Sequence, residues 1–97
     1  MTVTIFSKPS CVQCSATYRG LEKLGMSKTD YEVVNIEDDP TARDFVMKLG
    51  HLQAPVVLVH EGPWATFEAT PDNRDAHWSG FRPDKLRELP ALLSASA

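Results

Sequence analysis

The pattern of apolar positions predicts three β-strands in the first 60 residues. Residues 3–7 (VTIFS) and 31–36 (YEVVNI) are rich in β-branched and aromatic residues, which favour strands. Residues 55–60 (PVVLVH) are almost continuously apolar, without the alternation of a half-exposed strand. We therefore expect the third strand to be buried on both of its faces.

The stretches between and after these strands have helical spacing instead. Apolar residues recur every three or four positions in residues 11–24, 37–50 and 81–89, which predicts three helices. Capping residues, glycines and prolines mark the expected helix ends. These are Ser10 and Gly25 for the first helix, Pro40 and Gly50 for the second, and Pro83 and Pro90 for the last.

The pattern is weaker between residues 61 and 77. A turn signal stands at Gly62-Pro63, residues 65–69 (ATFEA) alternate like a strand, and residues 70–76 (TPDNRDA) are polar. We expect a long β-hairpin here, with a fourth strand antiparallel to the third. The order β-α-β-α-β-β-α predicts an α/β fold, a four-stranded mixed sheet flanked by three helices, with a right-handed crossover between the first two strands.

Composition narrows the class of protein. A chain of 97 residues with 42% apolar residues is expected to form a single domain over residues 1–97. Its net charge of −3, with both signs interspersed, gives no reason to expect nucleic acid or an anionic membrane as a partner. The N-terminal residues have no signal-peptide pattern, so we expect a cytoplasmic protein. In a reducing compartment a lone cysteine pair is more often redox-active or metal-binding than structural.

The only two cysteines, Cys11 and Cys14, stand at the expected start of a helix that follows a strand. Unpaired backbone N–H groups at a helix N-terminus, together with the nearby Lys8, are expected to favour the Cys11 thiolate. Cys14 lies one turn deeper and is expected to be less exposed and to hold its proton more tightly. This asymmetry predicts a dithiol exchange, in which Cys11 attacks a partner disulfide and Cys14 resolves the mixed disulfide.

Two other interpretations of the cysteine pair remain open. A tetrahedral zinc site would need two of His51, His60 and His77 as further ligands, but these lack the close spacing of a zinc knuckle. The cysteines could also be inert buried thiols on a helix face. The position of the pair between a strand and a helix favours redox exchange, with no metal site and no bound cofactor.

Residues 52–57 (LQAPVV) are the second informative stretch. Pro55 at the start of a buried strand restricts Ala54 to extended geometry. A plain strand boundary explains this pattern. A cis bond before Pro55 is the alternative, and it would expose the Ala54 backbone for pairing with an extended substrate peptide.

Three stretches of the chain resemble the NrdH-redoxins, which are glutaredoxin-like proteins with a thioredoxin fold and thioredoxin-like activity. They are CVQC (11–14), APVV (54–57) and HWSGFRPDKL (77–86), and WSGFRPD is far more specific than CxxC. The resemblance covers residues 2–60 and 77–89. It implies a thioredoxin fold with Cys11 as nucleophile, Cys14 as resolving thiol and Pro55 as a cis-proline. It also implies that Lys8, Val12, Gln13 and Ala54 support the active site.

The resemblance also implies a physiological task. The NrdH-redoxins act as hydrogen donors for class Ib ribonucleotide reductase and are recharged by thioredoxin reductase with NADPH. A glutathione-dependent glutaredoxin is the alternative within redox chemistry, and a metal- or cluster-binding module that uses Cys11 is the alternative outside it.

The WSGFR stretch is expected to form a partner-docking surface beside the dithiol. Its members are Trp78, Ser79, Gly80, Phe81 and Arg82. Where ordinary glutaredoxins use small and acidic residues to hold glutathione, bulky Trp78 and Phe81 would crowd the groove and offer an apolar face. The alternative is that both aromatic residues belong to the core and cap the last helix.

Residues 61–77, with their own Trp64, depart from the NrdH-redoxin pattern and form an apparent insertion. Surface insertions are thermodynamically cheap, so we expect this one to leave the fold intact. It could alter which reductase or target protein docks. We expect the protein itself to be a monomer.

Overall fold

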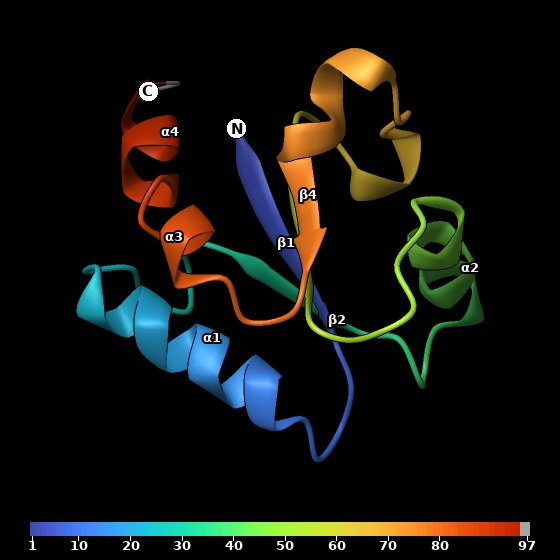
Figure 1. Ribbon diagram of the computed structural model, residues 1–97, viewed down its shortest axis with the longest axis horizontal. Helices are drawn as coiled ribbons and strands as arrows, with labels where there is room; N and C mark the ends of the chain where they lie inside the picture. Colours follow the sequence, from blue (N-terminus) through green and yellow to red (C-terminus); the bar gives the residue numbers. More distant parts are fainter. Residues whose placement is uncertain (96–97) are drawn as a thin grey trace.

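A four-stranded mixed sheet runs through the centre of the computed structural model, which describes residues 1–95 (Figure 1). The strands are β1 (Thr2–Ser7), β2 (Glu32–Asn35), β3 (Val56–His60) and β4 (His77–Ser79), in the order β2-β1-β3-β4. β1 pairs parallel with β2 and antiparallel with β3, and β3 pairs antiparallel with β4. The predicted α/β fold with a mixed sheet is therefore confirmed.

Helices cover both faces of this sheet. The α-helices are α1 (Val12–Lys23), α2 (Pro40–Lys48), α3 (Pro83–Leu86) and α4 (Leu89–Ala95), and two 3₁₀ helices are η1 (Trp64–Thr66) and η2 (Pro71–Ala76). In Figure 1, α1, α3 and α4 lie on one side of the sheet, while α2 and residues 61–76 lie on the other. Within residues 1–95, no helix has the length and apolarity needed to cross a membrane.

The alternation of side chains along the strands divides the core into two clusters. On β3, Val57 and Val59 pack on the α1 side, while Val56 and Leu58 pack on the α2 side. Successive residues of a strand point to opposite faces, so a strand covered on both sides needs apolar residues at every position. All five residues of β3 are buried, as its continuous apolar run predicts.

The start of α1 differs from the expectation. Cys11, and not Ser10, is the N-cap of this helix. Ser10 has φ of +56°, in the left-handed region, whereas an N-cap residue usually has an extended backbone. The second helix follows the usual pattern, because the Asp39 carboxylate caps it by accepting a hydrogen bond from the Ala42 N–H at 3.1 Å.

The prediction of a strand from the alternation of residues 65–69 is wrong. The segment after Gly62-Pro63 forms a 3₁₀ turn, in which the Phe67 N–H donates to the Trp64 carbonyl at 3.1 Å. Residues three apart share one side of such a turn, so Trp64 and Phe67 both reach the α2-side core. The fourth strand begins only at His77, where it pairs antiparallel with β3 as expected.

The last helix is also divided, into α3 and α4. Pro90 lies in the first turn of α4. Its missing N–H costs no hydrogen bond there, because the N–H groups of the first turn have no partner within the helix. The sequence predicted one helix limited by Pro90, whereas the chain turns at residues 87–88 and starts a second helix. Leu86 and Leu89 on either side of this turn are fully buried.

Candidate active site

Cys11 and Cys14 form a disulfide at the N-terminus of α1, directly after the loop that follows β1. The Cys11 sulfur takes the place of a capping oxygen and accepts a hydrogen bond from the Cys14 N–H at 3.1 Å. Cys14 is only 3% exposed, whereas Cys11 is half-buried. This difference agrees with the expectation that Cys14, one turn deeper in the helix, is less exposed than Cys11.

The surface around Cys11 is open and partly apolar. A shallow depression beside the disulfide is lined by Lys8, Cys11 and Val12 together with Tyr18 and Val33. Val12 is 80% exposed, so the residue after Cys11 projects into solvent. A cation and exposed apolar side chains therefore flank the accessible sulfur of the pair.

The loop that leads into β3 contains the expected proline geometry. The Ala54–Pro55 peptide bond is cis. Both residues are buried, and the Pro55 carbonyl accepts a hydrogen bond from the Gly80 N–H at 2.8 Å. This hydrogen bond ties the proline loop to the segment that follows β4.

The cysteine motif contacts the same segment through Gln13. The Gln13 Oε1 atom accepts a hydrogen bond from the Phe81 N–H at 2.9 Å, between residues 68 positions apart. Gly80 has φ of +82°, and a Cβ there would lie 3.0 Å from that oxygen, so a glycine fits this crossing. Sequence reasoning placed Gln13 only by its motif and missed this contact, because an amide side chain gives no signal of its distant partner.

Trp78 lies in the core, so the core interpretation is the correct one for this residue. It is 7% exposed on β4 and packs with Leu21 and Leu86 on the α1 side of the sheet. Among the described residues its indole nitrogen has no hydrogen-bond partner, and the Lys85 amine lies 5.7 Å from the ring centroid. Trp78 therefore offers little surface to a partner, contrary to the docking expectation.

Ser79, Phe81 and Arg82 of the WSGFR stretch are closer to solvent, whereas Gly80 is buried. Phe81 is 39% exposed, and Ser79 is half-buried. The exposed Arg82 guanidinium forms an ion pair with Asp84 at 3.0 Å, and this hydrogen-bonded pair lowers the pKa of the Asp84 carboxyl. Of the two aromatic residues expected to dock a partner, only Phe81 reaches the surface.

The three histidines do not gather at the cysteines. His51 and His77 share a hydrogen bond of 2.7 Å between their rings, and His60 is held between Thr4 and the Gly62 carbonyl. Among residues 1–95 there is no group of three or more side chains of the kinds that commonly hold a metal ion. The ligands that a zinc interpretation requires are therefore engaged with other partners.

Comparison with known proteins agrees with this geometry. The sequence profile of the glutaredoxin family matches residues 3–62. The chain is 37% identical over 98 aligned positions to the glutaredoxin-like protein NrdH of Escherichia coli K12, covering 100% of both chains. It is 30% identical to the protein of the same name from Lactococcus lactis IL1403 over 87 positions, covering 90% of this chain and 97% of the relative.

A solved structure is similar as well. The glutaredoxin-like protein NrdH-redoxin of Escherichia coli, described as having a thioredoxin-like activity profile, matches with a TM-score of 0.69 and 32% identity. The match covers 92% of this chain and 95% of that chain.

The sheet order, the disulfide at a helix N-terminus and the cis-proline loop define a dithiol protein of the thioredoxin-fold, glutaredoxin-like class. The full-length similarity narrows that class. The chain belongs to the NrdH family of glutaredoxin-like proteins, with Cys11–Cys14 as its redox-active disulfide. The resemblance inferred from CVQC and WSGFRPD is thereby confirmed.

Proposed function

We propose that this protein is a dithiol electron carrier that reduces a class Ib ribonucleotide reductase and is recharged by thioredoxin reductase with NADPH. The observation that carries the proposal is the asymmetry of the disulfide. Cys11 is reachable and accepts a backbone N–H, while Cys14 is buried behind it. A hydrogen bond to the sulfur stabilises a thiolate, so Cys11 is the nucleophile.

The exchange proceeds in two steps. The Cys11 thiolate attacks one sulfur of the target disulfide, which breaks that bond and releases the other target sulfur as a thiolate. Cys14 then attacks the Cys11 sulfur, forms the Cys11–Cys14 disulfide and releases the second target thiolate. The target gains two electrons and this protein loses two, which the reductase later restores from NADPH.

The neighbouring residues support these steps in distinct ways. Lys8 adds positive charge near the Cys11 sulfur, Val12 offers an apolar contact, and Gln13 fixes the cysteine motif against Phe81. The backbone beside the cis bond at Ala54 and Pro55 is the place for an extended target segment. We place this function in a monomer in the cytoplasm, where both partner enzymes would operate.

Two coupled assays test the electron source. The oxidised protein is mixed with thioredoxin reductase and NADPH in one assay, and with glutathione, glutathione reductase and NADPH in the other. We expect fast NADPH oxidation in the first and little in the second, because Phe81 occupies space where a glutathione site would need small residues. A clear preference for glutathione would assign the protein to the glutathione-dependent glutaredoxins instead.

A further inference from the structure

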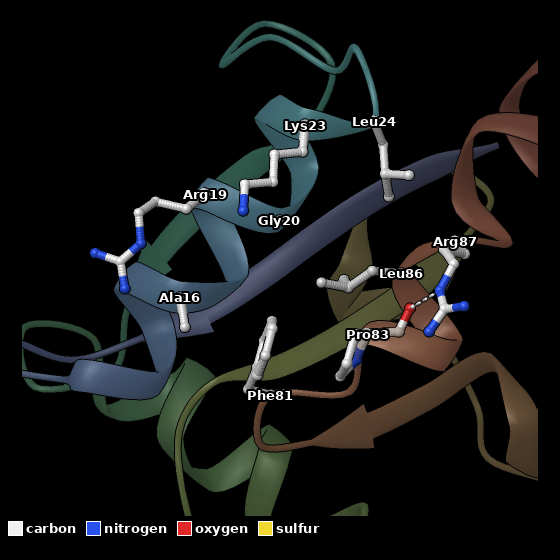
Figure 2. Close-up of a pocket in the computed structure, with 9 residues that line it drawn as sticks. All are labelled: Ala16, Arg19, Gly20, Lys23, Leu24, Phe81, Pro83, Leu86 and Arg87. Carbon is white, nitrogen blue, oxygen red and sulfur yellow. Dashed lines mark hydrogen bonds between the residues drawn. The ribbon is translucent and has the colours of Figure 1, made fainter.

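An apolar groove separates α1 from α3, on the side of the sheet that carries the disulfide (Figure 2). It encloses about 460 Å³ and is lined mainly by apolar atoms, with Phe81, Leu24 and Leu86 among its residues. Figure 2 shows the Phe81 ring and the Leu86 side chain projecting into the space in front of α1. Gly20 keeps this space open, since a Cβ there would lie 3.1 Å from the Leu86 Cδ1 atom.

The rim of the groove is entirely positive. Arg19 and Lys23 of α1 and Arg87 after α3 line it, and no Asp or Glu does. All three are exposed, and none forms a salt bridge within residues 1–95. The whole chain carries 13 acidic and 10 basic residues, so three unpaired cations around one groove depart from the average surface.

Phe81 connects the groove to the cysteine motif. Phe81 contributes its ring to the groove, while its backbone N–H donates to Gln13 inside the cysteine motif. A molecule bound in the groove therefore contacts Phe81, the residue that donates this hydrogen bond. This geometry suits a partner that must approach Cys11 at the same time.

We propose that the groove binds an acidic peptide segment of the protein whose disulfide is reduced. An apolar side chain of the segment lies on Phe81 and Leu24, and flanking carboxylates pair with Arg19, Lys23 and Arg87. This proposal rests on the proposed function, because it names a recognition element of the same target. The apolar surface between the cations favours a peptide with an apolar side chain over a nucleic acid, and the test compares the peptide directly with an oligonucleotide and an anionic vesicle.

The test measures binding without electron transfer. The oxidised full-length protein is titrated with a short cysteine-free peptide that carries one Leu between Asp and Glu residues, and backbone amide shifts are followed by NMR. We expect the amides of Ala16, Leu24 and Phe81 to shift. Changing the acidic residues of the peptide to Lys, or its Leu to Ser, is expected to weaken binding about tenfold at low salt.

Variants of the protein locate the site. Lys23→Glu and Arg87→Glu are each expected to weaken the acidic peptide about tenfold and to strengthen the Lys-substituted peptide. Lys48→Glu makes the same charge change at the end of α2, on the other side of the sheet, and is expected to leave the peptide affinity within about twofold. A far-ultraviolet circular dichroism spectrum confirms that each variant is folded.

Several outcomes would overturn the proposal. They are equal binding of the acidic and Lys-substituted peptides, no binding at about 1 mM peptide, and tighter binding of a single-stranded oligonucleotide or an anionic vesicle than of the peptide. Because the peptide has no cysteine, a failed NADPH assay with thioredoxin reductase would not change this titration. The proposed function and the proposed peptide binding can therefore be refuted independently of each other.

Discussion

The two faces of the sheet are closed by segments of different kinds. On one face, α1, α3 and α4 pack on Val57 and Val59, and this face carries the disulfide and the basic groove. On the other face, α2 leaves part of the sheet to residues 61–76, which have only 3₁₀ turns of their own. The comparison indicates that the disulfide lies on one face, while residues 61–76 cover the core on the opposite face.

The second face depends on an aromatic cluster. Trp64 meets Phe6 edge to face at a centroid distance of 5.3 Å and Phe45 at 5.1 Å. The ring centroids of Phe6 and Phe45 lie 5.7 Å apart, so a strand, a helix and the segment after β3 meet at three rings. Aromatic pairs at these distances add to the stabilisation from buried area. Trp64 and Phe67 therefore belong to the core, although the residues around them are exposed.

Substitution of the cysteines, on the first face, is expected to have the largest effect on activity. Cys11→Ser is expected to abolish disulfide transfer, because the remaining thiol, Cys14, is buried and out of reach of a target disulfide. Cys14→Ser is expected to accumulate a stable mixed disulfide with an oxidised target, seen as a shifted band on a non-reducing gel. Preferential alkylation of Cys14 in the reduced wild-type protein at neutral pH would contradict these roles.

A change on the other face should affect stability and spare the chemistry. Trp64→Ala removes a half-buried ring from the cluster and is expected to lower the free energy of unfolding by about 2–3 kcal/mol. Urea denaturation measures this change, and reduction of a small aromatic disulfide reports the dithiol in the same variant. Asp72→Ala, at an exposed position of η2, serves as control and is expected to change stability by less than about 0.5 kcal/mol. Loss of thiol reactivity in folded Trp64→Ala would show that the faces are coupled.

The sequence predicted the first face well and the second only in part. The order of the elements along the chain follows from periods of two and of three to four residues, and the burial of β3 follows from its continuous apolar run, both of which the sequence displays directly. Residues 64–67 escape this method, because a single 3₁₀ turn is too short to establish a period and resembles alternation. The contact of Gln13 with Phe81 escapes it as well, since it depends on how α1 packs against the segment that follows β4.

The polar half of the apparent insertion should contribute less than its aromatic half. Residues 70–76 are mostly exposed, and Asn73 holds them locally, through the Thr70 N–H and the Glu68 carbonyl. Replacing residues 71–75 by a short Gly-Ser linker is expected to lower the free energy of unfolding by about 1 kcal/mol or less. Reduction of a small disulfide should be retained, and any loss should appear in the rate with a protein partner. A stability loss as large as that of Trp64→Ala would place this half in the core too.

The smallest expected effect is a pH dependence where the second face meets the proline loop. His77 at the start of β4 contacts the Phe67 ring, and His51 lies between α2 and that loop. Burial lowers the pKa of both histidines from the ordinary value of 6.5, and for His51 the neighbouring His77 lowers it further. Lys8 and Arg43, which line the cavity beside His51, are cations that oppose a charge there.

The direction of this dependence follows from proton binding. Above about pH 6.5 both histidines are neutral in the folded and the unfolded chain, so their contribution to stability is complete. As the pH falls below that value the unfolded chain binds protons first, and stability declines until the lowered pKa values are passed. Urea denaturation between about pH 7.5 and about pH 5.5 should therefore show a decline that His51→Gln makes shallower, because one of the two titrating rings is gone. An equal slope in both proteins would mean that His51 binds protons equally in the folded and the unfolded chain, and that it gives the junction of the two faces no response to pH.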